Sequence, residues 1–173
     1  MKKLLTVLLC CVLASCASPD VEQYAAEKPA LSLQDYLNGD LQAWGMFQDR
    51  SGEVIKRFHV KMTGTWEGDT GTLDERFTYS DGTTERRVWT LTRQPDGNWQ
   101  GTADDVEGVA QGTLAGNAFH WRYTLRLPVG GRTWLVDLDD RMYLVDDNVM
   151  LNRAVMSKWG FTLGSITLSF YKP

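Results

Sequence analysis

Apolar and polar residues alternate along most of the chain after about residue 43, which is the period of β-strands with one buried face. In NAFHWRYTLRLPV, residues 117–129, the apolar positions are Phe119, Trp121, Tyr123, Leu125 and Leu127. In EVIKRFHVKMTGTW, residues 53–66, they are Val54, Phe58, Val60, Met62 and Trp66. Both histidines, His59 and His120, fall on the opposite, polar faces. These patterns predict strands that turn one side toward a dry interior.

Turn signals separate these runs at short intervals, in the order DRSGE, EGDTG, YSDGTT, QPDGN, AGN, PVGGR and VDDN. They predict about nine or ten strands, and the short sequential connections favour an up-and-down antiparallel barrel over a Greek-key sandwich. SLQDYLNG, residues 32–39, predicts a short helix over 32–37, with Ser32 as N-cap and Gly39 as terminator. The expected fold class is therefore all-β, with one short N-terminal helix.

The first residues carry a different pattern. MKKLLTVLL has the charged start and short apolar core of a secretory signal, and LASC, residues 13–16, resembles the bacterial lipobox. The resemblance implies cleavage after residue 15 and acyl chains on Cys16, which would be the route to the membrane. Ala17 after the cysteine implies the outer membrane, with the domain facing the periplasm. We expect a signal peptide at 1–15, a lipidated N-terminus and tether at 16–30, and one barrel domain at 31–173.

The amino-acid composition narrows the range of possible binding partners. The formal net charge is −4, which argues against nucleic acid as a partner. All three cysteines lie within residues 10–16, so the predicted mature domain has no thiol for metal binding or catalysis. The length is sufficient for one domain with a real core.

Longer motifs resemble known families. A short helix, a meander of hairpins and GTW at residues 64–66 are similar to the calycin group of lipocalin-like barrels. WGMFQDRSG, TGTWEGDTGTLDE, RVWTLT and MYLVDDNVMLNRAVMSKWGF resemble a family of Gram-negative lipoproteins, domain of unknown function 3833. That resemblance covers nearly all of residues 31–173 and implies localisation and fold, but no activity.

Catalytic and metal chemistry find no support in the sequence. The serines lack a nucleophile motif such as G-x-S-x-G, the glycines lie at hairpin spacing, and two outward histidines cannot make a metal centre. The acidic pairs 104–105, 139–140 and 146–147 match no calcium loop and are typical of turns and strand ends. We therefore expect a non-enzyme without metal or cofactor.

Charges inside apolar stripes are the more informative signal. Asp140 interrupts the even face of WLVDLDDRMYL, and Arg153 interrupts the odd face of VMLNRAV in the following segment. Because the two segments should form a hairpin, we expect these side chains to approach each other. One interpretation is a structural ion pair, and the other is that Arg153 binds a ligand carboxylate. Glu75 is a third expected interior charge.

Seven tryptophans allow two interpretations, packing of the core or lining of a ligand site. The ligand interpretation names Trp66, Trp121, Tyr123 and Trp134, together with Asp140 and Arg153, as binding residues. Two functions follow. The first is an outer-membrane-anchored carrier or sequestering protein for an apolar ligand, a fatty acid or other lipid. The second is a filled structural barrel that serves envelope assembly through an unidentified protein partner.

Overall fold

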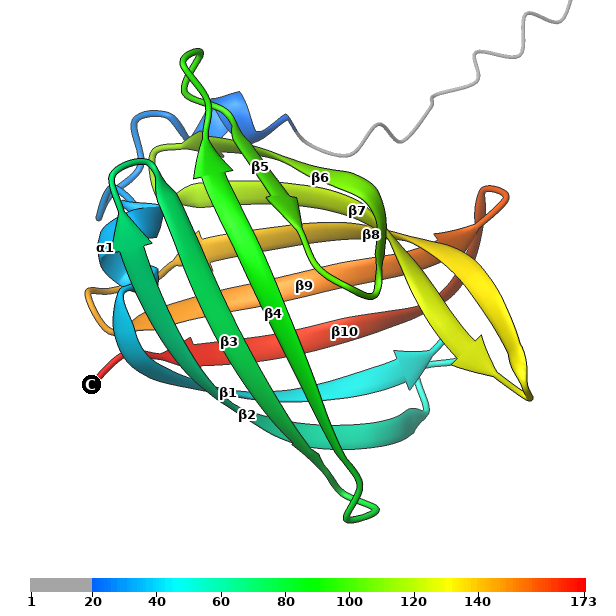
Figure 1. Cartoon of the computed structure of the whole chain (residues 1–173). Helices are drawn as coiled ribbons and strands as arrows, with labels where there is room; N and C mark the ends of the chain where they lie inside the picture. Colours follow the sequence, from blue (N-terminus) through cyan, green and yellow to red (C-terminus); the bar gives the residue numbers. More distant parts are fainter. Residues whose placement is uncertain (1–19) are drawn as a thin grey trace, which may run out of the picture.

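The computed structural model describes residues 20–173, so the predicted signal peptide and Cys16 lie outside the described residues. Ten antiparallel strands close into a barrel in which each strand lies beside its sequence neighbours and β1 pairs with β10 (Figure 1). The predicted all-β, up-and-down antiparallel barrel is therefore confirmed. The elements are η1 (Val21–Tyr24), α1 (Leu33–Leu37), β1 (Gly39–Asp49), β2 (Val54–Glu67), β3 (Thr70–Tyr79), β4 (Thr84–Arg93), β5 (Trp99–Thr102), β6 (Val106–Ala115), β7 (Ala118–Val129), β8 (Arg132–Leu144), β9 (Val149–Lys158) and β10 (Phe161–Tyr171).

One end of the barrel is closed by α1. The Ser32 side chain accepts a hydrogen bond from the Asp35 amide, which starts the helix as predicted, and Gly39 follows its last turn with a φ of 79°. Leu33 and Leu37 are buried in one core cluster with Leu41, Met62 and Trp99, which we call the floor of the barrel. A Cβ on Gly64 of β2 would collide with the Leu37 carbonyl oxygen, so a glycine is required for this close approach.

The C-terminal tail holds α1 in place at the closed end of the barrel. Lys172 Nζ donates to the carbonyl oxygens of Tyr36 at 3.0 Å and Asn38 at 2.6 Å, which are free acceptors at the end of α1. The Tyr36 hydroxyl donates to the Asn148 carbonyl oxygen at 2.9 Å. The helix is thus held to the loops by polar contacts as well as by its apolar face.

The segment before α1 also belongs to the folded unit. Val21 of η1 is buried with Ala115 and Ala118 of the β6–β7 hairpin, and the Leu31 amide donates to the Gly116 carbonyl oxygen at 2.8 Å. The sequence predicts a free tether over 16–30, but its described part packs on the outside of the barrel. In the described residues, no helix has the length and apolar character needed to span a membrane.

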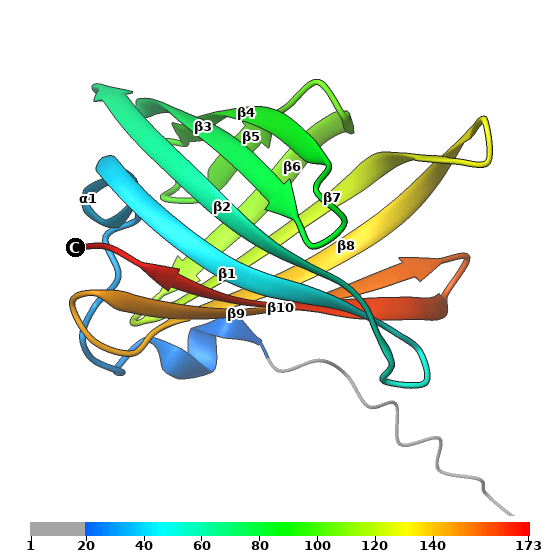
Figure 2. The same cartoon turned by 90° about the horizontal axis from the view of Figure 1, so that it is seen from below.

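The opposite end of the barrel is not covered by a helix of the described residues and bears long hairpins (Figure 2); we call it the open end. Val136, Leu138, Ala154 and Met156 form a second, smaller core cluster between the strands there. Pairing of β7 with β6 stops at Leu125, and pairing of β8 with β9 begins at Asp137. Residues 126–136 therefore form a two-stranded ribbon that projects beyond its neighbours. The β9–β10 and β1–β2 hairpins end on the same side.

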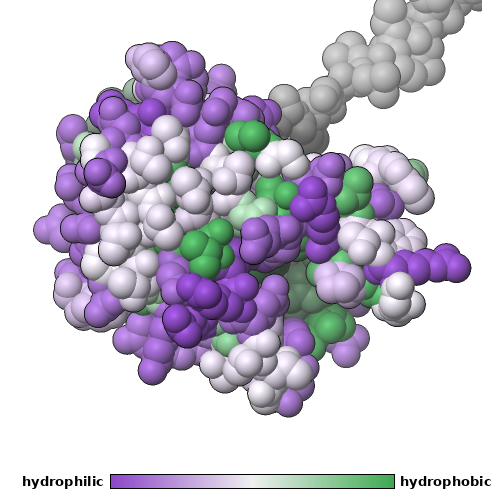
Figure 3. Space-filling view, in the orientation of Figure 1, coloured by the Kyte–Doolittle hydropathy of each residue, from purple (hydrophilic) through white to green (hydrophobic). Residues whose placement is uncertain are grey.

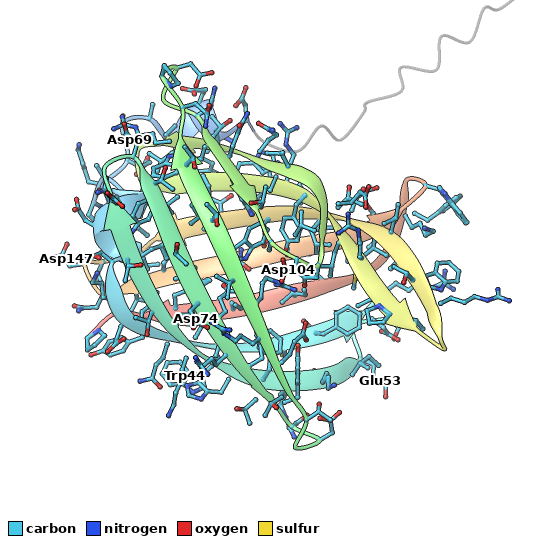
Figure 4. All side chains as sticks on the ribbon, in the orientation of Figure 1. Trp44, Glu53, Asp69, Asp74, Asp104 and Asp147 are labelled. Carbon is cyan, nitrogen blue, oxygen red and sulfur yellow. The ribbon has the colours of Figure 1, made fainter. Side chains whose placement is uncertain are left out.

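The wall has a gap beside β4. The short strand β5 pairs with β4 from Thr90 to Arg93, so residues 84–89 of β4 lack a strand partner on that side. Figure 4 labels Asp104 in the β5–β6 loop that lies beside this gap. The interior is reached here without crossing a hydrogen-bonded pair of strands.

Candidate functional site

A cavity of about 130 Å³ occupies the barrel between α1 and the open end. Figure 3 shows that the surface is hollowed on this side of β4 and that hydrophobic side chains border the hollow. The lining is mostly apolar and includes Leu33, Leu37, Phe58, Leu73, Phe77, Trp89, Leu91, Phe119, Trp121, Met142, Met150, Ile166, Leu168 and Phe170. Its volume is below the roughly 300–1,000 Å³ of pockets for drug-sized ligands. It is close to the roughly 150 Å³ of an engineered cavity that holds benzene.

A partly buried arginine lies on the β3–β4 wall of this cavity. Arg87 of β4 pairs directly with Glu75 of β3, and Arg87 Nη1 lies 3.9 Å from Glu75 Oε2. Arg87 also donates to Asp105 of the β5–β6 loop, from Nη2 at 2.7 Å and from Nε at 2.9 Å. Because Asp105 lies on the other side of the gap beside β4, this bidentate ion pair bridges the gap. The pair fixes the guanidinium at the entrance to the cavity.

A second polar group comes from β8 and β9. Asn152 donates from Nδ2 to Asp140 Oδ1 at 2.7 Å, and both side chains are buried. Tyr123 of β7 also lines the cavity. The apolar cavity therefore contains two polar groups that come from different strands. Ligand-binding sites use a few polar groups placed in this way to orient the ligand.

Burial controls the charge of these carboxyl groups. It raises the pKa of Glu75 to about 7, with Arg87 opposing the rise and the negative charges of Asp105 and Asp140 adding to it. It raises the pKa of Asp140 to about 6, opposed by hydrogen bonds from Asn152 and Tyr123. Close to neutral pH both carboxyl groups thus hold protons over part of the population. A protonated carboxyl group both donates and accepts a hydrogen bond, so the cavity can satisfy an uncharged polar group.

Three of the residues predicted from the sequence meet in this cavity: Trp121, Tyr123 and Asp140 line it, and Glu75 lines it as the expected third charge. Trp66 lies deeper, toward the closed end, where its ring packs edge-on against Trp99 at 5.7 Å between centroids. It belongs to the packed floor and is not among the side chains that line the cavity.

The predicted approach of Asp140 to Arg153 is wrong. The register pairs Asp140 with Ala154 and Arg141 with Arg153, so Asp140 and Arg153 point to opposite sides of the sheet. Arg153 is exposed on the outer wall, and Asn152 occupies the interior position. The error arises because β9 is apolar on both faces, which leaves its orientation undecided by alternation.

Trp134 is also misplaced by the prediction. It shares the inward side of β8 with Val136, but it lies on the ribbon that projects past the barrel, and 40% of it is exposed. Its ring lies 5.2 Å from Lys158 Nζ. The side of the strand is therefore right, whereas the ligand-lining position is not.

Sequence reasoning missed Arg87 and Asn152. Arg87 could have been found, because it shares an alternating face with Trp89 and Leu91 in RRVWTLT. Its partner Glu75 follows from the same hairpin once the turn YSDGTT sets the register. Asp105, read as a turn residue, does lie in a turn but also binds Arg87.

The histidines lie outside the cavity. His59 Nε2 is 2.8 Å from Gln42 Oε1 and its ring stacks on Trp44, whereas His120 Nε2 is 3.1 Å from Asp139 Oδ1. Burial lowers the pKa of His120. Within residues 20–173, no three histidine, cysteine, aspartate or glutamate side chains converge to hold a metal ion.

Comparisons agree with the fold. The family model DUF3833, described as protein of unknown function, matches residues 10–172, as the sequence resemblance predicts. No curated protein matches the chain. The S-type phycobiliprotein lyase CPES from Guillardia theta is similar at 6% identity and a TM-score of 0.63, over 90% of this chain and 98% of that chain. A DUF3598 protein of unknown function from Nostoc punctiforme is similar at 11% identity and a TM-score of 0.52, over 86% of this chain and 51% of that chain. At these identities the likeness shows the fold alone.

Proposed function

We propose that the barrel of this chain, which belongs to the DUF3833 family of proteins of unknown function, binds one apolar ligand in its interior. The observation that carries the proposal is the apolar cavity with two polar groups, the partly buried pair of Arg87 with Asp105 and the buried pair of Asp140 with Asn152. A barrel that only packs its own side chains gains nothing from buried carboxyl groups, because burying them costs free energy.

The cavity favours an uncharged polar group on the ligand. Arg87, the guanidinium that lines the cavity, is already paired with Asp105, while Glu75 and Asp140 add negative charge whenever they ionise. An anionic head would therefore meet repulsion at high pH. We propose that the lipid is a fatty alcohol, a monoacylglycerol or a fatty acid in its protonated form. At about 130 Å³ the cavity takes part of an acyl chain or one ring.

The proposed place of action is the periplasmic face of the outer membrane, through acyl chains on Cys16. The support is the lipobox LASC at residues 13–16 and Ala17 after it. Two or more acyl chains give stable attachment, whereas one gives marginal binding. Cys16→Ser should abolish labelling of the protein by radioactive palmitate in cells. Persistent labelling of that variant would contradict the assignment.

The proposal is binding rather than catalysis. One protein of similar structure is a lyase, so this type of barrel accommodates an enzyme. In this chain the cavity carboxyl groups contact Arg87, Asn152 and Tyr123, and burial raises the pKa of Tyr123, which disfavours a tyrosinate nucleophile there.

Quenching of tryptophan fluorescence tests the ligand directly, because Trp89 and Trp121 line the cavity. A brominated fatty alcohol should quench saturably at pH 8, and the matched fatty acid should bind at least tenfold more weakly there. At pH 5 the difference should shrink, since both the ligand and the cavity carboxyl groups gain protons.

A matched pair of variants locates the quenching. Ala154→Leu adds bulk inside the cavity and should abolish it, whereas Arg153→Leu changes the adjacent, outward position and should not. If neither ligand quenched the fluorescence saturably, the proposed ligand-binding function would be wrong. The second candidate, a filled barrel for envelope assembly, would then be favoured, and the small volume of the cavity is the observation on its side.

A further inference from the structure

Exposed apolar side chains gather on the hairpins around the open end. We call six of them the rim: Val129, Trp134, Leu135, Trp159, Phe161 and Leu163. Trp159 is 80% exposed and Phe161 is 74% exposed. Large aromatic side chains of this exposure require an explanation, because they contact neither the core nor the cavity.

The backbone holds these side chains outward. Residues 126–136 form the projecting ribbon, and Trp159 adopts a φ of 52° at the tip of the β9–β10 hairpin, before Gly160. Lys158 Nζ lies 5.2 Å from the Trp134 ring and 4.8 Å from the Trp159 ring, and it donates to the Leu135 carbonyl oxygen at 2.7 Å. One lysine therefore joins the two hairpins into one surface.

The charge of this surface differs from that of the whole chain. Residues 126–136 and 158–171 contain no aspartate or glutamate, although the chain as a whole has a net charge of −4. Arg132 stands in the ribbon and Lys158 between the two tryptophans. Basic residues beside tryptophan on protruding apolar tips are the composition of protein surfaces that enter the interface of an anionic bilayer.

We propose that the rim docks on the surface of a lipid bilayer that contains anionic lipid. The exposed aromatic side chains at the hairpin tips can enter the headgroup layer, while Lys158 and Arg132 beside them attract anionic headgroups. Docking would place the open end of the barrel, and the hollow beside β4, next to the lipid. The proposal goes beyond ligand binding and does not depend on what the cavity holds.

Sedimentation with vesicles tests the rim apart from the Cys16 anchor. Residues 20–173 form the complete barrel with its own core, and they lack the cysteine. This part of the chain should sediment with vesicles of phosphatidylethanolamine and phosphatidylglycerol (3:1). It should bind phosphatidylcholine vesicles more weakly, and sodium chloride at about 0.5 M should weaken binding to the anionic vesicles because salt screens Lys158 and Arg132.

Variants assign the effect to the tips. Trp159→Asn with Phe161→Ser should lower the partition coefficient at least tenfold without changing the melting temperature. Asparagine is chosen because it tolerates a positive φ. The control Trp44→Ser changes a half-exposed tryptophan of the outer wall, away from the open end, and should leave partition unchanged (Figure 4).

Three results would overturn the proposal. They are failure of the unmodified protein to sediment with anionic vesicles, equal partition of the double variant, or an equal loss in Trp44→Ser. Sedimentation velocity without vesicles tests whether the rim binds a second copy of the chain instead. In that case the unmodified protein would sediment as a dimer and the double variant as a monomer. Ala154→Leu, which should abolish quenching by the ligand, should leave partition into vesicles unchanged, so the failure of ligand binding and the failure of docking are separable.

Discussion

The two ends of the barrel are built from different interactions. At the closed end, α1 inserts Leu33 and Leu37 into a floor of large apolar side chains, and Lys172 binds the last helical carbonyl oxygens. At the open end, the wall has a gap beside β4 that is bridged by an ion pair, and the hairpins expose aromatic side chains.

This difference separates stability from binding. Apolar packing at the closed end stabilises the fold without any group that must lose a charge. Buried carboxyl groups toward the open end reduce stability at neutral pH, because burial opposes their ionisation. Groups that weaken a fold and also line a cavity are candidates for function.

The largest expected effect is at the cavity entrance, with Arg87→Met. Removing the guanidinium leaves two carboxylates, Glu75 and Asp105, without their partly buried partner, so the free energy of unfolding at pH 8 should fall by about 3–5 kcal/mol. Urea denaturation measures it. The double change Arg87→Met with Glu75→Gln should recover part of the loss. A loss below about 1 kcal/mol would mean that this ion pair does not hold the gap together.

At the closed end, Leu33→Ala should cost about 3 kcal/mol, because Leu33 is 2% exposed and its removal leaves a void under α1. The matched change at the open end, Leu163→Ala, should cost less than about 0.5 kcal/mol, since that side chain belongs to the exposed rim. Thermal and urea unfolding of the two variants compare the ends directly. Similar losses would contradict the division proposed for them.

The pH dependence of stability sharpens the comparison further. Because burial raises the pKa of Asp140 from 3.8 to about 6, the folded state binds the proton more tightly than the unfolded state. Stability should therefore fall as pH rises from about 4 to about 7, by roughly 2–3 kcal/mol for this group.

Asp140→Asn removes this contribution. The variant should be more stable than the unmodified chain at pH 8 by up to about 2 kcal/mol and should show a flatter profile in urea melts between pH 5 and pH 8. Glu75 should still contribute a slope of the same sign, since burial raises its pKa to about 7. A variant that is less stable at pH 8 would show that Asp140 is stabilised as a carboxylate.

The smallest expected effect is that of Arg153→Ala on the outer wall. Arg153 is exposed and pairs in register with Arg141, so its removal should change the free energy of unfolding by less than about 0.5 kcal/mol and leave ligand binding intact. Thermal melts and the quenching titration check both. A loss of several kcal/mol would restore the interior position predicted from the sequence.

The sequence predicts the barrel well because its signals are local. The turns are short, and β7 has a polar and an apolar face, so Trp121 and Tyr123 are placed correctly inside. In β9 the outer face carries Val149, Leu151 and Val155, while the inner face carries Asn152. The inner face also carries Met150, Ala154 and Met156, so both faces are apolar and alternation leaves the orientation of β9 undecided.

Other parts of the site depend on pairing between strands. Trp134 lies on the expected side of β8, but the ribbon extends beyond the neighbouring strands, and strand length relative to neighbours is not encoded in alternation. The Arg87–Asp105 pair depends on a loop that crosses a gap in the wall. Such contacts follow from the closed geometry of the barrel and not from any one segment.

The shortness of β5 has a consequence for ligand size. With four residues, β5 leaves residues 84–89 of β4 without a strand partner on that side. A chain longer than the cavity could therefore leave the barrel beside these residues, where no hydrogen bond between strands would have to break.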